Sequence, residues 1–94
     1  MVIKVECIGV NPSCLNCKRA EINALKAAEE LRNAGVDVLV EKLDIMSPEL
    51  INKYGLLMSP AIAVNGVLKS NGKVPDVRVI VEFIKDALHD GLQN

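Results

Sequence analysis

Aromatic side chains are almost absent from this sequence: its 94 residues contain one Tyr, one Phe and no Trp. Proteins that bind single-stranded nucleic acid stack bases on aromatic rings, and those that bind duplexes or anionic membranes need a basic face. Here 11 Lys and Arg residues are balanced by 12 Asp and Glu residues, which gives a formal net charge of −1. We therefore expect no nucleic-acid partner and no membrane partner.

Long apolar runs and a secreted-type cysteine pattern are absent too. No stretch is long enough to cross a bilayer, and the first residues alternate with charged side chains, unlike a signal-peptide core. Three cysteines are an odd count, which fits no disulfide framework of a secreted module. We expect a soluble, cytoplasmic protein in which a disulfide, where it forms, is transient and catalytic.

Half of the residues are apolar, so the chain can bury a core without structural disulfides. Because aromatics are scarce, that core must consist of Val, Ile, Leu and Ala. Two expected helices carry apolar stripes at helical spacing, which predicts that each packs one face on a sheet. The stripes are Cys17, Ala20, Ala24, Ala27, Ala28 and Leu31 in the first helix, and Val77, Ile80, Val81, Ile84 and Leu88 in the last.

The periodicity of apolar residues predicts the element order βαβαββα. Pro48 suits a first helical position, Gly35 and Gly55 are helix stop signals, and Asn65-Gly66 suits a two-residue type I′ turn. The first two strands should be parallel neighbours through a right-handed crossover. Strands are expected at Val2 to Ile8, Val36 to Leu43, Ala61 to Val64 and Val67 to Lys69. Helices are expected from Leu15 to about Ala34, from Pro48 to about Tyr54 and from Pro75-Asp76 onwards. A polar loop is expected at Ser70 to Lys73 and a frayed end at His89 to Asn94.

Two cysteines three residues apart, Cys14 and Cys17, lie where the first strand gives way to the first helix. Sulfurs spaced in this way can close a small disulfide ring reversibly or hold one metal ion. A helix that begins near Cys14, with Ser13 or Asn11 as its N-cap, surrounds that sulfur with unpaired N–H groups and favours the thiolate. Cys17 would lie one turn deeper and be more buried. This asymmetry predicts that Cys14 attacks a substrate disulfide and that Cys17 resolves the mixed disulfide.

Cys14-Leu15-Asn16-Cys17 between a strand and a helix, with Ser59-Pro60 just before the hairpin, resembles the thioredoxin-like fold. The match is closest to the small thioredoxin-like, redox-active disulfide proteins of archaea and bacteria. It covers essentially the whole chain, including Pro-Ala-x-x-x-Asn-Gly at Pro60 to Gly66. The resemblance implies one domain over residues 1–94, a three-layer α/β/α sandwich built on a four-stranded mixed sheet.

The resemblance also implies a thioredoxin- or glutaredoxin-like protein-disulfide oxidoreductase with Cys14 and Cys17 as catalytic residues. Its partners would be protein disulfide substrates and an upstream reductase; no cofactor and no metal is implied, and we expect a monomer. In that family the proline before the third strand is cis and faces the Cys-x-x-Cys pair. Carried onto this sequence, Pro60 would be cis, and the backbone at Ser59 would pair with an extended substrate segment.

The sequence departs from thioredoxins at the site itself. Thioredoxins usually carry Trp before the first Cys and Gly-Pro between the pair, whereas Ser13 and Leu15-Asn16 stand here. The buried carboxylate of the thioredoxin strand would fall near Ile8, so that proton acceptor is missing. Glu6 could substitute for it, although strand alternation directs Glu6 elsewhere. The redox potential and the partner therefore stay open.

Other functions remain open from the residues alone. A copper- or zinc-binding Cys-x-x-Cys protein is one, but a four-ligand zinc site needs two further ligands, and only Cys7 and His89 remain. A thioredoxin-fold binding module without turnover is another. Use of glutathione through Asn71-Gly72 and the start of the last helix is a third. Cys7 is expected in the core, unless it reaches the helix start as a third redox partner.

Overall fold

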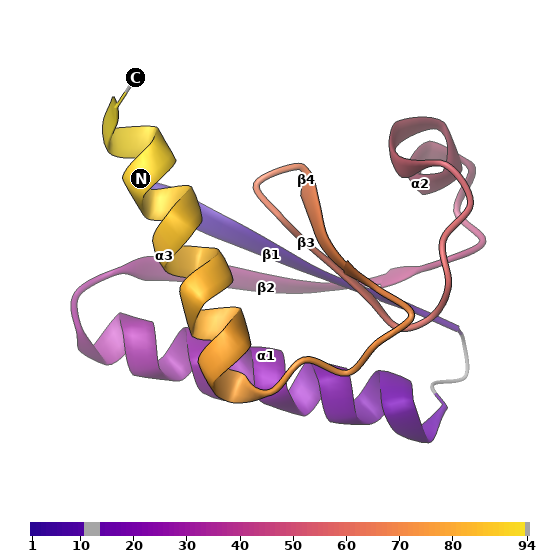
Figure 1. Cartoon of the computed structure of the whole chain (residues 1–94), viewed down its shortest axis with the longest axis horizontal. Coiled ribbons are helices and arrows are strands. Elements are labelled where there is room, and N and C mark those ends of the chain that lie inside the picture. Colours follow the sequence, from indigo (N-terminus) through magenta and orange to yellow (C-terminus); the bar gives the residue numbers. More distant parts are fainter. Residues whose placement is uncertain (11–13, 94) are drawn as a thin grey trace.

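The structure is a computed structural model that describes residues 1–10 and 14–93 (Figure 1). Its element order confirms the predicted βαβαββα pattern, although the expected N-cap residues Asn11 and Ser13 lie outside the described residues. Cys14 takes the N-cap position instead. The elements are β1 (Val2–Gly9), α1 (Leu15–Asn33), β2 (Asp37–Asp44), α2 (Pro48–Tyr54), β3 (Ala61–Val64), β4 (Val67–Asn71) and α3 (Val77–Gln93).

The four strands form one mixed sheet in the order β2-β1-β3-β4. β1 pairs with β2 in parallel and with β3 antiparallel, so β1 is one of the two interior strands, and it leads into the Cys-x-x-Cys segment. The β3–β4 hairpin turns at Asn65 and Gly66, which both have positive φ (49° and 81°), as the predicted type I′ turn requires. β4 runs to Asn71, so the polar loop expected at 70–73 is wrong in its first half: Ser70 and Asn71 pair with β3.

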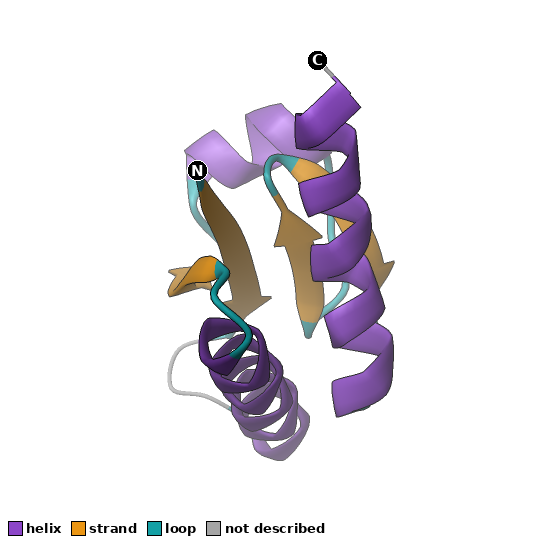
Figure 2. Cartoon of the chain, turned by 90° about the vertical axis from the view of Figure 1, so that its left-hand side faces the viewer, coloured by secondary structure: helices purple, strands orange, loops and turns teal. Residues whose placement is uncertain are grey.

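Helices cover both faces of the sheet. α1 and α3 lie side by side on one face, and α2 packs on the other (Figures 1 and 2). The small side chains of α1 let this helix approach the sheet closely, with Ile3 and Val5 of β1 beneath it. The buried residues of α1 confirm the predicted stripe: Cys17, Ala20, Ala24, Ala27, Ala28 and Leu31.

The last helix is longer than expected. α3 continues past His89 to Gln93, where the sequence predicted fraying. The Met1 side chain lies against this end, because a Cβ added to Gly91 would clash with its Cε and Sδ. Within the described part of the chain, no helix combines the length and the apolar character needed to cross a membrane.

A buried acid joins the sheet to α2. The Glu6 side chain lies on the α2 face of β1, and the residue is only 7 % exposed. The Tyr54 hydroxyl, at the end of α2, donates a hydrogen bond of 2.6 Å to Glu6 Oε1. Burial and the neighbouring Glu6 carboxylate raise the pKa of Tyr54 above its ordinary value of 10.0. The bond therefore keeps the phenol protonated and the carboxylate partnered.

Replacing Tyr54 with Phe should lower the free energy of unfolding by about 1–3 kcal/mol, the cost of leaving a buried polar group without its donor. A group whose pKa is higher in the folded state stabilises that state at pH values below its unfolded-state pKa. This stabilisation is lost as the pH rises above the unfolded-state pKa. The difference between wild type and Tyr54→Phe should therefore shrink above about pH 10. Urea unfolding of both proteins at neutral and alkaline pH measures this difference in the free energy of unfolding. A difference that does not change with pH would contradict this account.

Candidate active site

The two cysteines of the Cys-x-x-Cys segment meet at the start of α1. Cys14 is the exposed N-cap residue, and Cys17 in the first turn is only 7 % exposed. The Cys17 backbone N–H donates to Cys14 Sγ at 3.2 Å, so a helix-end donor points at the exposed sulfur. Both cysteines are free thiols, and their sulfurs lie 2.7 Å apart. A disulfide needs about 2.05 Å, so a small side-chain movement closes the ring.

The surroundings of Cys17 favour its thiolate. Burial opposes ionisation, but hydrogen bonds from the Cys14 thiol, from the backbone at Val10 and Cys14, and from the Ser59 hydroxyl outweigh it and lower the pKa of Cys17. Cys17 therefore ionises more readily than a free cysteine does, and the Cys14 thiol donates a hydrogen bond to its sulfur.

Gly9 at the end of β1 provides the space that Cys17 occupies. A Cβ added to Gly9 would lie 2.9 Å from Cys17 Sγ and 3.1 Å from Cys17 Cβ, closer than real side chains approach. The sequence did not single out Gly9. It directly follows the strand expected at Val2 to Ile8, where the chain leads into the motif, and the absence of a side chain there leaves room for Cys17.

Ser59 and Pro60 lie beside the pair. The Ser59–Pro60 peptide bond is cis, as the resemblance implied, and Pro60 lines the same cavity as Cys17. β4 and the residue after it fix this segment: Asn71 Oδ1 accepts from Met58 N–H at 2.7 Å, and Gly72 N–H donates to the carbonyls of Met58 and Pro60. The structure thus brings together all four residues singled out from the sequence.

Exposed apolar side chains occur on the segments that carry these residues. Met58, which directly precedes Ser59, is 69 % exposed, so it does not pack in the core. Leu15, between the two cysteines, is 65 % exposed, and Leu56 in the segment before Met58 is also exposed. An extended polypeptide that reaches the sulfurs would therefore meet apolar side chains on both segments.

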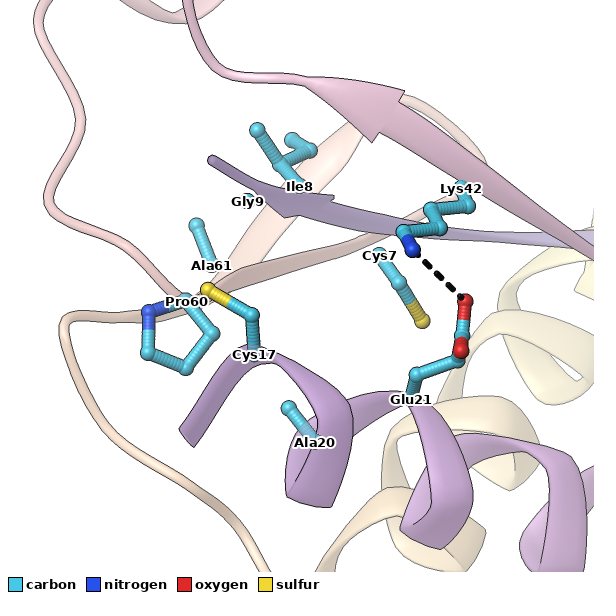
Figure 3. Close-up of a pocket in the computed structure, with 9 residues that line it drawn as sticks. All are labelled: Cys7, Ile8, Gly9, Cys17, Ala20, Glu21, Lys42, Pro60 and Ala61. Atoms are coloured by element: carbon cyan, nitrogen blue, oxygen red, sulfur yellow. Dashed lines mark ion pairs between the residues drawn. The ribbon is translucent and has the colours of Figure 1, made fainter. Parts of the chain in front are cut away.

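A small cavity lies behind the buried sulfur (Figure 3). Cys7 contributes to its wall, so this thiol is buried as expected, at 5 % exposed, but also adjoins the site. Burial, together with the negative charge of Glu21, raises the pKa of Cys7 to about 12, so it stays a thiol. Sequence reasoning overlooked Glu21 and Lys42 here. The cavity is lined by Cys7, Ile8, Gly9, Cys17, Ala20, Glu21, Lys42, Pro60 and Ala61.

Glu6 does not lie near the sulfurs. It faces α2 and Tyr54, whereas its neighbour Cys7 faces α1, because successive side chains of a strand point to opposite faces. Alternation thus directs Glu6 away from the site, as the sequence indicated. Ile8, where the resemblance would place a carboxylate, packs in the apolar cluster with Leu50 under α2.

Comparisons with known proteins agree with this geometry. The family model described as a thioredoxin domain matches residues 1–85. A probable thioredoxin of Methanothermobacter marburgensis is 37 % identical over 89 residues, which is 94 % of this chain and 99 % of the relative. A thioredoxin of Methanothermobacter thermautotrophicus is 37 % identical over 83 residues, covering 88 % of this chain and 99 % of the relative.

Solved structures share the fold at low identity. A Staphylococcus aureus protein of unknown function superposes with a TM-score of 0.62 at 17 % identity, over 96 % of this chain and 94 % of that one. Human ERp44 gives a TM-score of 0.63 at 11 % identity, over 89 % of this chain and 27 % of that longer chain. The structural matches support the fold, and the sequence matches extend over nearly the whole chain. This chain belongs to the thioredoxin-domain family.

Proposed function

We propose that this protein is a thiol–disulfide oxidoreductase that reduces protein disulfides with the Cys14–Cys17 couple. One observation carries the proposal: an exposed and a buried sulfur lie 2.7 Å apart at a helix start, with a backbone N–H directed at the exposed one. Reversible ring closure needs that proximity, and the division of roles needs that difference in exposure. Membership of the thioredoxin-domain family supports the same type of chemistry.

Cys14 is the nucleophile in this proposal, because its sulfur is the one that a substrate can reach. The Cys14 proton passes along its hydrogen bond to Cys17 Sγ as Cys14 Sγ attacks one sulfur of the substrate disulfide. That S–S bond breaks, and the other substrate sulfur leaves as a thiolate that takes up a proton from water. Cys17 then attacks Cys14 Sγ, which releases the second substrate thiol and leaves the Cys14–Cys17 disulfide. Two electrons pass to the substrate, and an upstream reductase returns the pair to the dithiol.

Ser59 and Pro60 form the docking edge for the substrate. This segment is hydrogen-bonded to Asn71 and Gly72, so it is a fixed edge beside Cys17. An extended substrate segment can pair its backbone with such an edge, and the exposed Met58 and Leu15 side chains add apolar contact. The expected substrate is a polypeptide disulfide in an extended, accessible segment.

A redox titration tests the proposed couple. We expect that equilibration in graded dithiol–disulfide buffers, followed by denaturation, alkylation and mass measurement, shows the loss of two labels in one two-electron transition. Cys7 keeps its label throughout, because its thiol is buried away from the buffer. Cys7→Ser should therefore leave the midpoint unchanged, whereas Cys14→Ser and Cys17→Ser each abolish the transition.

Retention of all three labels in oxidising buffer would contradict the proposal. Copper or zinc binding by the reduced protein would then favour a metal-binding function. A Cys14→Ser variant that keeps a partner's affinity, in a protein whose wild type shows no turnover, would favour a binding module instead. These outcomes separate disulfide reduction, metal binding and partner binding without turnover.

The close packing of Gly9 against Cys17 makes a second prediction. Gly9→Ala forces Cys17 to move, and we expect the free energy of unfolding of the dithiol form to fall by about 1–3 kcal/mol, as for other overpacked sites. The same substitution in a Cys17→Ala background should cost less, because the Sγ contact is gone. Denaturant unfolding of the four proteins measures this coupling; equal costs in both backgrounds would show that the sulfur contact does not matter.

A further inference from the structure

The cations of the described residues divide into two groups by what they contact. One group has a partner, which is an acidic residue, an aromatic ring or a backbone carbonyl. Its members are Lys4, Arg32, Lys42, Lys53, Arg78 and Lys85. The other group forms no ion pair with a described residue, and it occupies α1 after the Cys pair and the segment from β4 to α3. These unpaired cations are Lys18, Arg19, Lys26, Lys69 and Lys73.

The segments that build the site carry no acidic residue. Residues 7–20 contain the Cys pair, and residues 50–75 contain Ser59 and Pro60 and reach almost to α3; neither segment has an Asp or a Glu. All 12 acidic residues of the chain lie elsewhere. The net charge of −1 therefore conceals a separation of charge, with positive charge in excess on the site segments and negative charge in excess on the rest.

Three of the unpaired cations are brought together because the connection from β4 to α3 packs against α1 (Figure 1). Asn23 Nδ2 on α1 donates to the carbonyl of Pro75 at 3.0 Å. Arg19 and Lys26 lie about one helical turn before and after Asn23, so they share its side of the helix. Lys73 lies two residues before Pro75 on the connection. We call Arg19, Lys26 and Lys73 the basic rim.

The acidic residues nearest the basic rim already have partners. Glu30, on the same side of α1, pairs with Arg78 of α3. Asp76 also acts on the Arg78 charge, and its Oδ1 accepts from the Val79 N–H at the start of α3. Both carboxylates are thus directed at Arg78 and at the end of α3, and the positive charge of the rim is left for another molecule.

Folding alone does not favour cations at this end of α1. The first turn of the helix has no acidic residue, and Lys18 and Arg19 directly follow Cys17. The positive end of the helix dipole lies there, so basic side chains lower the stability of the helix and acidic ones would raise it. The charge pattern therefore has to be explained by something other than the stability of α1.

A groove between β4 and α3 continues the positive surface. Its volume is about 410 Å³, and it is lined by Phe83 of α3 together with Lys69 and Lys73. Asn71 lines it as well, and Asn71 Oδ1 accepts from the Met58 N–H, so the groove adjoins the docking edge. It thus offers a chain that lies on the docking edge one apolar contact and two cations.

We propose, resting on the function proposed above, that the substrates are polypeptide disulfides flanked by acidic residues, which the basic rim and the two lysines of the groove bind. Opposite charges raise the rate at which a substrate meets Cys14 and help to orient it, and salt screens both effects. A second copy of this chain does not fit the same surface, because two such positive surfaces repel each other.

Two synthetic peptides test the proposal. Each contains one disulfide, and they differ only in carrying Glu or Lys beside the cysteines. We expect the dithiol protein at low ionic strength to reduce the Glu peptide at least tenfold faster than the Lys peptide, measured as second-order rate constants by acid quench and chromatography. The net charge of −1 alone would favour the Lys peptide. The preference should disappear as salt rises from about 0.01 M to about 1 M, where the Debye length falls to about 3 Å.

A double charge reversal locates the preference. Lys26→Glu with Lys73→Glu should bring the ratio of the two rate constants to about one or below. Lys26 lies about 13 Å beyond Cys17 along the helix, and any effect on the sulfurs themselves would change both rates alike and leave their ratio unchanged. The matched control, Lys4→Glu with Lys85→Glu, makes the same change in net charge outside the rim and should keep the ratio within about twofold of wild type.

Three results would overturn the proposal and leave the oxidoreductase function standing. They are equal rates for the two peptides in wild type, faster reduction of the Lys peptide, or the same loss of preference in the control as in the rim variant. Reduction of neither peptide by wild type would instead contradict the proposed function, and the inference would fall with it. The two failures are therefore distinguishable.

Discussion

The close approach of the start of α1 to the end of β1 is the contact on which the site depends. The alanines of α1 lie against Ile3 and Val5, and Gly9 leaves room for Cys17, so the helix can begin directly above the strand end. This packing buries Cys17 and leaves Cys14 at the exposed N-cap, with a backbone N–H directed at its sulfur. The difference in exposure between the two sulfurs is therefore a consequence of how helix and strand pack, because the residue types are identical.

Because successive side chains of β1 point to opposite faces of the sheet, Glu6 and Cys7 lie on different faces. Cys7 faces α1 and adjoins the cavity behind Cys17, whereas Glu6 faces α2 and accepts from Tyr54. A buried carboxylate needs a donor, and on the α2 face Tyr54 provides it, which also anchors the short helix. On the α1 face, the carboxylate of Glu21 comes from the helix; it lies beside the Cys7 thiol and pairs with Lys42.

Much of this structure could be predicted from local pattern. The element order, the hairpin turn and the α1 stripe follow from apolar periodicity and from Asn65-Gly66. The length of β4 could not, because it depends on pairing with β3. The Cys pair was found through its spacing, whereas Lys42 reaches the cavity behind it only through the register of β1 with β2. Long-range register has no signature in a single sequence.

Trapping the mixed disulfide tests the central claim, that the exposed sulfur attacks and the buried one resolves. Cys17→Ser, mixed with a peptide that contains one disulfide, should accumulate one peptide per protein, and fragmentation should place it on Cys14. Cys14→Ser should give no adduct, because Cys17 is buried, and wild type should release reduced peptide and become oxidised. An adduct that forms on Cys17 in Cys14→Ser as fast as on Cys14 in Cys17→Ser, or no adduct in either variant, would contradict the account.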